Sequence, residues 1–190
     1  MALATDCRAV HNKTAYGKMG LPKGRQQRYV IPNQEEHVPP EQNKMRALLQ
    51  QVHKIAVVGA KDAPGQAVDN VGRYLIKAGF KIFPVHPVRQ HVWGLPTYKS
   101  IGDLPEPVDM INLFRAAEYC PGHAREVLAL PWKPLVFWMQ LGISSTEATA
   151  LLEKEGMAVI QDACLMVEHR RLFPQGNPPS CAPADSKNGK

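Results

Sequence analysis

Short apolar runs alternate with amphipathic stretches from residue 41 to residue 172. A run that is apolar on both sides is typical of a strand in a parallel sheet covered by helices on both faces. The stretches between them carry apolar residues at helical spacing and end near glycine or proline. The pattern predicts an α/β fold, a single domain with a three-layer, doubly wound, mainly parallel five-stranded sheet. The predicted strands are 55–58, 81–85, 109–114, 135–138 and 157–160, and the predicted helices are 41–52, 67–78, 121–130, 144–156 and 164–172.

Local sequence signals mark several element ends. Pro84 and Pro87 are expected to end the second strand, because proline has no N–H to donate to a neighbouring strand. Residues 144–147 carry Ser-Ser-Thr-Glu, which predicts a capping box at the start of the fourth helix. We expect Asp162 to cap the last helix. Residues 88–108 are rich in turn formers and predict an irregular connector between two strands.

The two ends of the chain differ in composition from the predicted domain, which spans 41–173. Residues 1–40 lack apolar periodicity and form a predicted basic, irregular arm, and residues 174–190 form a predicted disordered tail. The net charge of +6 belongs mainly to the arm, since residues 34–173 hold equal numbers of basic and acidic side chains. A solvated extension is the simplest interpretation. Packing of the arm on a second subunit, in a homo-oligomer, is an alternative, and contact with nucleic acid is a weaker one.

Cysteine usage and hydropathy restrict the cellular setting. The four cysteines are widely spaced and include no CxxC pair, which favours a reducing compartment over a disulfide framework. The first residues contain no apolar core of a signal peptide. No apolar run approaches the roughly 18 residues of a membrane span. We therefore expect a cytoplasmic protein that makes no membrane contact.

A glycine-bearing turn follows the first predicted strand and has the chemistry of an anion site. It joins a strand to a helix, whose free N–H groups and dipole favour phosphate. Gly59 would allow close approach to a phosphate, and Lys61 would add a positive charge. The turn does not match GxGxxG, because Lys61 replaces the second glycine. The residues predicted to contact phosphate are Gly59, Ala60, Lys61, Asp62, Pro64, Gly65 and Gln66.

The end of the second predicted strand lacks the acidic residue that holds the ribose in NAD-binding domains. It carries Pro-Val-His-Pro at 84–87, followed by Arg89. A carboxylate there would repel a phosphorylated ribose, whereas His86 and Arg89 tolerate or attract one. This difference favours coenzyme A or NADP over NAD. The remaining predicted cleft residues follow the strand ends, where the crevice of such a sheet lies: Val85, His86, Pro87, Arg89, Phe114, Arg115, Gln140 and Gly142.

The sequence shows no convincing catalytic or metal-binding group. Cys164 and His169 are five residues apart, which places them about 140° apart around a helix. Cys120 and His123 have a metal-like spacing but lack a second pair of ligands. We therefore expect no metal site and no independent catalysis. An NADP-linked reductase, which would need a proton donor near the cleft, is an alternative.

Five segments together resemble the small stand-alone coenzyme-A-binding domain proteins, the YccU-like group. The resemblance covers about 130 residues in matching order and spacing. The same fold forms the N-terminal domain of the succinyl-CoA synthetase α subunit. The matching segments are IAVVGAKDAPGQAVDNVGRYL, FPVHP, SIGDLPEPVDMINLFR, WMQLGIS and VIQDACLMVEH.

The resemblance implies a Rossmann-like sheet that holds coenzyme A by its adenosine and phosphates. It implies that 59–64 form the phosphate turn, that 84–87 border the adenosine, and that 114–115 lie beside the ligand. Gln140 and Gly142 would line the far side. The chain has no second domain to carry a phosphohistidine, so the implied role is binding rather than thioester synthesis.

The chain departs from the family pattern at four positions of the implied site. The family usually has Ser where Lys61 stands, Arg where Gln66 stands, Ser where Val68 stands and Asn where His86 stands. Hydroxyl and guanidinium groups are good phosphate donors, and Gln66 and Val68 are poorer ones. A fold that has lost its ligand and acts as a protein-interaction module is therefore a further alternative.

Overall fold

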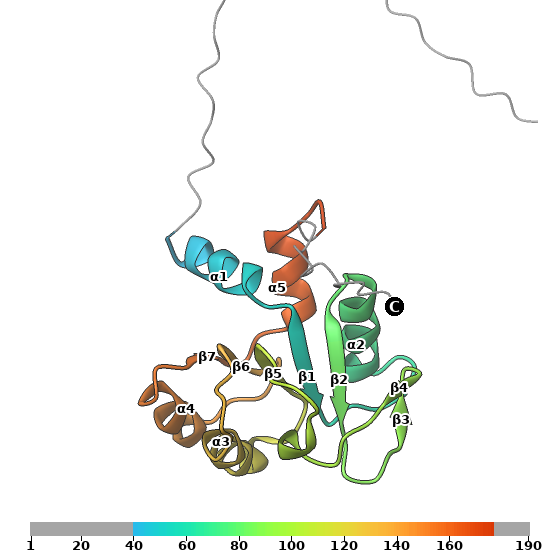
Figure 1. Cartoon of the computed structure of the whole chain (residues 1–190). Helices are drawn as coiled ribbons and strands as arrows, with labels where there is room; N and C mark the ends of the chain where they lie inside the picture. The colour runs from blue at the N-terminus through green and yellow to red at the C-terminus, as the bar shows by residue number, and fades with distance from the viewer. Residues whose placement is uncertain (1–39, 177–190) are drawn as a thin grey trace, which may run out of the picture. The chain divides into compact units, whose positions relative to one another are not determined.

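The central sheet has five parallel strands in the order β2-β1-β5-β6-β7, in a computed structural model that describes residues 40–176 (Figure 1). This confirms the predicted α/β fold. The predicted arm up to residue 39, and the tail beyond residue 176, lie outside the described residues. The strands of the sheet are β1 (Lys54–Val58), β2 (Lys81–Val85), β5 (Met110–Leu113), β6 (Val136–Met139) and β7 (Ala158–Ile160). The helices are α1 (Pro40–Gln50), α2 (Ala67–Lys77), α3 (Cys120–Leu128), α4 (Thr146–Glu153) and α5 (Leu165–Leu172), with the 3-10 helices η1 (Ile101–Asp103) and η2 (Ala117–Tyr119).

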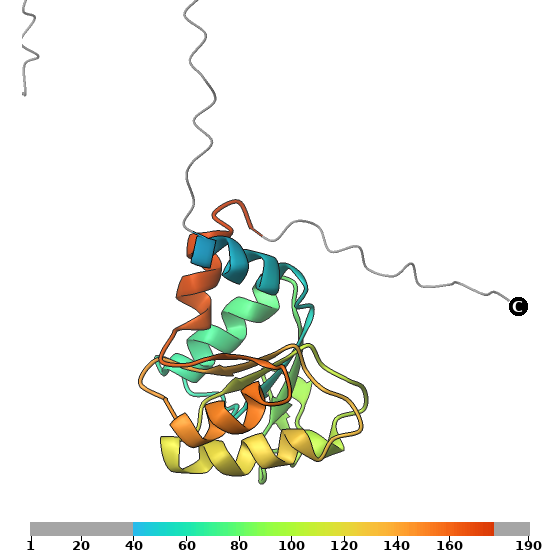
Figure 2. The same cartoon turned by 90° about the vertical axis from the view of Figure 1, so that its left-hand side faces the viewer.

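Helices cover both faces of the sheet, as Figure 2 shows. Successive strand residues point to opposite faces, so each strand supplies two hydrophobic clusters. In β1, Ile55 and Val57 pack with α1, α2 and α5, whereas Ala56 and Val58 pack with α3 and α4. All four side chains are buried. Burial on both faces is the physical reason that the strands are continuously apolar in the sequence.

The strand order reverses between β1 and β5. From β1 the chain passes through α2 to β2 on one side, and it then returns to form β5 on the other side of β1. The helices that follow β1 and β5, α2 and α3, consequently lie on opposite faces of the sheet (Figure 2). Such a reversal opens a crevice at the carboxyl ends of the strands, where ligands of this fold class bind.

Two of the predicted end signals act differently in the structure. Pro84 does not end β2 but lies inside it, paired with Val57. Proline is accommodated because β2 is an edge strand, in which one side of the backbone has no strand partner in the sheet. The N-cap of α4 is Ser145, whose side chain accepts a hydrogen bond from the N–H of Ala148 at 3.2 Å. The predicted capping box at 144–147 is therefore wrong by one residue, and Glu147 instead pairs with Arg125.

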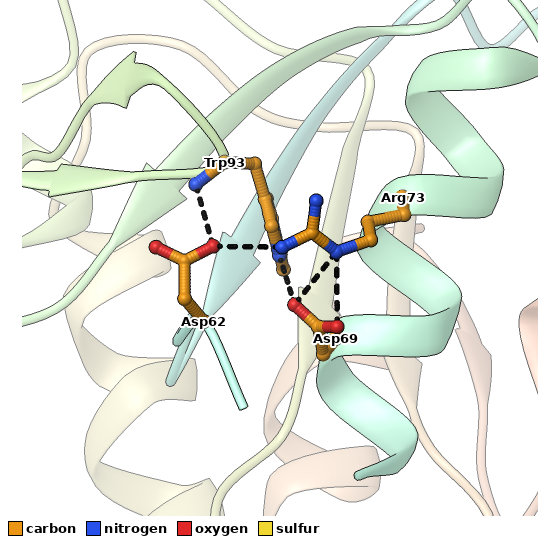
Figure 3. Close-up of polar contacts among 4 residues, drawn as sticks. All are labelled: Asp62, Asp69, Arg73 and Trp93. Carbon is orange, nitrogen blue, oxygen red and sulfur yellow. Dashed lines mark hydrogen bonds and ion pairs between the residues drawn. The ribbon is translucent and has the colours of Figure 1, made fainter. Parts of the chain in front are cut away.

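The connector after β2 contains a small hairpin that the sequence did not predict. It consists of β3 (His91–Val92) and β4 (Leu95–Pro96) and places Trp93 against α2 (Figure 3). The indole N–H of Trp93 donates to the buried Asp69 at 2.9 Å, and Arg73 donates to the same carboxylate. These bonds, that from Arg73 foremost, hold the pKa of Asp69 below its ordinary value. Gly72 permits the contact, since a Cβ there would lie 2.1 Å from the indole ring.

The turn between β1 and α2 lies directly against the end of β5. Gly59 has a φ of +83°, and a Cβ at this position would lie 2.5 Å from the carbonyl oxygen of Phe114. The N–H groups of Gly59 and Ala60 both donate to the carbonyl of Val85, at 2.9 and 3.3 Å. The turn is thus fixed to the ends of β2 and β5 at once, and only glycine fits the position without strain.

We expect Gly59→Ala to destabilise the fold more than Gly65→Ala. Gly65 has a similar φ of +84°, but a Cβ there would meet nothing within 4 Å. The left-handed conformation should cost about 1–2 kcal/mol in either variant, and the clash with backbone should add about 1–3 kcal/mol for Gly59→Ala. Urea unfolding of both variants measures the difference, and equal losses of unfolding free energy would contradict it.

Candidate functional site

A cleft of about 390 Å³ lies at the carboxyl ends of β1, β2 and β5, where the strand order reverses. One wall is the turn after β1 and the first residues of α2. The opposite wall follows β5, with an apolar contribution from Ile143 in the β6–α4 loop. The apolar residues of the lining are Ala67, Val68, Phe114, Ala116 and Ile143, and the others are Gly59, Lys61, Gln66, His86 and Arg115.

The backbone donors of this cleft are at the start of α2 rather than at Gly59. The N–H groups of Gly59 and Ala60 are bonded to Val85, so they are not free for a ligand. The N–H of Gln66 donates to Ala63. Those of Ala67 and Val68 have no hydrogen-bond partner within residues 40–176. First-turn N–H groups have no partner inside their own helix, and no side chain caps α2. Two donors and the positive end of a helix dipole are therefore available to an anion.

Three basic side chains line the same cleft. Lys61 comes from the turn after β1, His86 follows β2, and Arg115 follows β5. The guanidinium of Arg115 stacks on the ring of Tyr119, 4.8 Å from its centroid, which restricts its position. Among the described residues, no carboxylate lines this cleft. The arrangement attracts anions.

The hydrogen bonds of His86 fix which of its nitrogens carries a proton. Its Nδ1 accepts hydrogen bonds from the N–H groups of Val88 at 3.2 Å and Arg89 at 3.4 Å. In the neutral ring the proton is therefore on Nε2, which is left as a donor. Burial lowers the pKa of His86 below its ordinary value, and the positive charges of Arg89, Arg115 and Lys61 lower it further.

A second, smaller pocket of about 160 Å³ adjoins the cleft. The two share Gly59 and Arg115, and the second pocket extends toward α3. His123 and Glu126 of α3 line it, and the Nδ1 of His123 lies 3.0 Å from Glu126. The other lining residues are Val58, Val85, Pro87, Lys99 and Ser100.

The structure brings most of the predicted strand-end residues together. Gly59, Lys61, Gln66, His86, Phe114 and Arg115 line the cleft. Val85 and Pro87 line the adjoining pocket. Pro64, Gly65 and Arg89 are exposed and line neither cavity, although the charge of Arg89 acts on His86.

Four other predicted site residues have structural partners instead. Ala60 is fully buried. Asp62 accepts a hydrogen bond from the backbone N–H of Trp93 at 3.0 Å and pairs with Arg73, which fixes the turn to the β3–β4 hairpin (Figure 3). The remaining two follow β6 and line neither cavity. Gln140 is buried and donates to Asn112, and the N–H of Gly142 donates to Asp162.

Asp162 does not cap the last helix, contrary to the prediction. The N-cap of α5 is Cys164, which makes no side-chain capping bond. Asp162 instead connects two loops: it accepts from the N–H of Gly142 at 2.7 Å and donates its own N–H to Ile143 at 3.0 Å. It adopts a φ of 53°, a conformation that Asp tolerates better than most residues. These bonds hold Ile143 in place at the edge of the cleft.

Comparison with known proteins identifies the family. Residues 53–170 match the CoA_binding_2 family, described as a CoA binding domain. The chain belongs to this CoA-binding domain family. It is 35% identical over 130 residues to the uncharacterized protein YneT of Bacillus subtilis, which covers 68% of this chain and 95% of YneT.

Solved structures of similar proteins share the fold. A Thermus thermophilus protein is 40% identical, with a TM-score of 0.65, over 70% of this chain and 98% of its own. A hypothetical protein from Pyrococcus horikoshii is 27% identical, with a TM-score of 0.66, over 70% of this chain and 92% of its own. The predicted relationship to stand-alone CoA-binding domains is thereby confirmed.

The described part of this CoA-binding domain contains no cluster of three or more His, Cys, Asp or Glu that could hold a metal ion. Cys164 and His169 do not form a pair: Cys164 precedes α5, and the Nδ1 of His169 lies 2.7 Å from the hydroxyl of Tyr74. No helix among residues 40–176 has the length and apolar character needed to cross a bilayer.

Sequence reasoning missed several lining residues of the two cavities. Ala67 was predicted as helix but not as a site residue, and Val68 entered only as a departure from the family pattern. The uncapped start of that helix was the available signal for both. Lys99, Ser100, His123 and Glu126 come from the connector and from α3. Their polar character is ordinary for exposed positions, so the sequence held no signal that would separate them from the surface.

We expect the stability of the protein to depend on pH through His86. The folded state lowers the pKa of His86 below 6.5, so the unfolded chain binds the proton more readily. Stability should therefore fall as the pH decreases through 6.5 toward the lower folded-state pKa. In His86→Asn the side-chain oxygen can accept the same two N–H groups but does not titrate. Between about pH 7.5 and about pH 5, the wild type should lose more unfolding free energy than the variant; parallel curves would contradict this.

Proposed function

We propose that this protein binds coenzyme A or an acyl-CoA in the cleft beside α2, without catalysing a reaction of its own. The observation that carries the proposal is the lining of the cleft. It combines the free N–H groups of Ala67 and Val68 with the basic side chains of Lys61, His86 and Arg115, and no carboxylate of the described residues lines it. Membership of the CoA-binding domain family supports the same ligand.

A diphosphate suits the start of α2. The two free N–H groups lie within one helical turn, and the helix dipole adds to their attraction for an anion. Lys61 would supply a compact charge and Arg115 a planar pair of donors. The neutral His86 would add its Nε2–H. We place the ligand's diphosphate among these groups, rather than over the N–H groups of Gly59 and Ala60, because Val85 already accepts from both.

The two arms of coenzyme A differ in the surroundings that they need. The pantetheine arm is long and partly apolar, and it carries the thiol that bears acyl groups. Phe114, Ala116 and Ile143 give the cleft an apolar side that suits this arm. The nucleoside arm would then lie at the end of β2, where His86 and Arg89 tolerate the phosphate on its ribose.

Binding without catalysis is consistent with the side chains that line the cleft. A nucleophile with an adjacent general base would be the minimum for covalent catalysis. Within the described residues the cleft is lined by no Cys, Ser or Thr, and its histidine uses Nδ1 to support the turn after β2. The lining thus offers donors and charges for holding a ligand.

Reversing one charge in the cleft tests the proposal. Lys61→Glu should weaken binding of coenzyme A by about tenfold or more, because it replaces an attraction to phosphate by a repulsion. Lys154→Glu makes the same change at an exposed position after α4, at the opposite edge of the sheet, and should alter binding much less. Isothermal titration calorimetry gives both dissociation constants.

Two results would overturn the proposed function. One is the absence of binding heat and of any rise in melting temperature for the wild type at about millimolar coenzyme A. The other is an equal loss of affinity in the two charge-reversal variants, since that would place the ligand away from Lys61.

A further inference from the structure

The pocket beside α3 contains a histidine whose Nδ1 is in hydrogen-bond contact with a carboxylate. Glu126 accepts from the backbone N–H of Ile101 at 2.6 Å, and its other oxygen lies 3.0 Å from the Nδ1 of His123. Burial by itself would raise the pKa of Glu126, but the hydrogen bonds from His123 and from the N–H groups of Ile101 and Gly102 hold it below its ordinary value. Glu126 is therefore ionised near neutral pH and can only accept hydrogen bonds.

This contact determines what His123 can offer a ligand. Because the carboxylate of Glu126 has no proton to give, the Nδ1 of His123 must be the donor between them. In the neutral ring the remaining nitrogen, Nε2, then carries a lone pair and is an acceptor. Only 23% of the His123 side chain is exposed, and it lines the pocket.

The two histidines near the site thus have opposite hydrogen-bonding roles. His86 accepts backbone N–H groups through Nδ1, so its Nε2 is a donor, which suits a phosphate oxygen. His123 donates through Nδ1, so its Nε2 is an acceptor, which suits a ligand N–H. A phosphate has no N–H group and would leave that acceptor unmatched. The pocket beside α3 is therefore suited to a different part of the ligand.

The strand-end side of this pocket fits a flat base. Val58, Val85 and Pro87, at the ends of β1 and β2, form an apolar side, and the pocket is smaller and more enclosed than the cleft. It joins the cleft at Gly59 and Arg115, so one ligand can cross the edge of the sheet from the start of α2 to α3. A compact ring fits 160 Å³ better than a long flexible arm does.

We propose that the pocket beside α3 receives the purine base of the bound nucleotide, and that the Nε2 of His123 accepts a hydrogen bond from its exocyclic amino group. The inference rests on the proposed function, since it assigns one end of the same ligand. His123 is then the residue that selects adenine over a 6-oxo purine such as hypoxanthine. Glu126 is a positioning residue that keeps the lone pair of His123 directed to the ligand.

Replacing one group on the ligand tests the inference without altering the protein. Coenzyme A is compared by calorimetry with its analogue in which hypoxanthine replaces adenine, so that a carbonyl oxygen stands where the amino group was. The wild type should bind the analogue about tenfold more weakly, because two acceptors would then face each other. His123→Leu should bind coenzyme A more weakly than the wild type does and bind the two compounds nearly equally. Glu126→Gln should reduce the preference, because a neutral amide no longer requires Nδ1 to be the donor.

Dephospho-coenzyme A, which lacks the ribose phosphate, provides the matched control ligand. In His123→Leu the ratio of affinities for coenzyme A and dephospho-coenzyme A should stay at the wild-type value. A change in this ratio, with the preference between the two bases unaltered, would assign the pocket to the phosphate and overturn the inference.

Equal binding of coenzyme A and the hypoxanthine analogue by the wild type would also overturn it, while leaving the proposed function intact. Binding of neither compound would instead refute the proposed function. Circular dichroism of each variant checks that it is folded, and the wild-type comparison decides the question even where a variant is not.

Discussion

The contact between the β1–α2 turn and the ends of β2 and β5 determines the geometry of the whole site. Val85 accepts the N–H groups of Gly59 and Ala60, and the carbonyl of Phe114 lies where a side chain on residue 59 would be. These constraints place the turn at the point where the strand order reverses. The helix α2 begins directly after the turn in the chain. Gly59 thus serves the packing of the protein itself, and the N–H groups without a partner come from the helix that it positions.

The same edge of the sheet is reinforced by the hairpin after β2. Trp93 is bonded to Asp62 in the turn and to Asp69 in α2, so the turn, the helix and the hairpin hold one another (Figure 3). Arg73 pairs with both carboxylates, one of which is buried, so its single positive charge offsets one of their two negative charges. Neither carboxylate lines the cleft, whose own charged side chains include Lys61 and Arg115.

Neighbouring strand ends give the two cavities different chemistry. The cleft beside α2 offers hydrogen-bond donors and positive charge, whereas the pocket beside α3 offers an apolar wall and, at His123, an acceptor. They adjoin different helices, α2 and α3, which cover opposite faces of the sheet. A ligand with an anionic centre and a flat base at one end matches this division. The division follows from the topology of the sheet.

The layers, the five strands and the cluster of residues at the strand ends could be predicted from the amino-acid order. Burial on both faces requires continuous apolar strands, and chain order alone places Gly59, His86 and Arg115 at one edge. Which donors remain free depends on tertiary contacts, because Val85 accepts two turn N–H groups from a segment about 25 residues away in the chain. Gln140 and Gly142 are bonded to Asn112 and Asp162 and line neither cavity, whereas His123 lines the pocket beside α3. Periodicity encodes which face of an element is buried, but it carries no record of which distant partner satisfies each polar group.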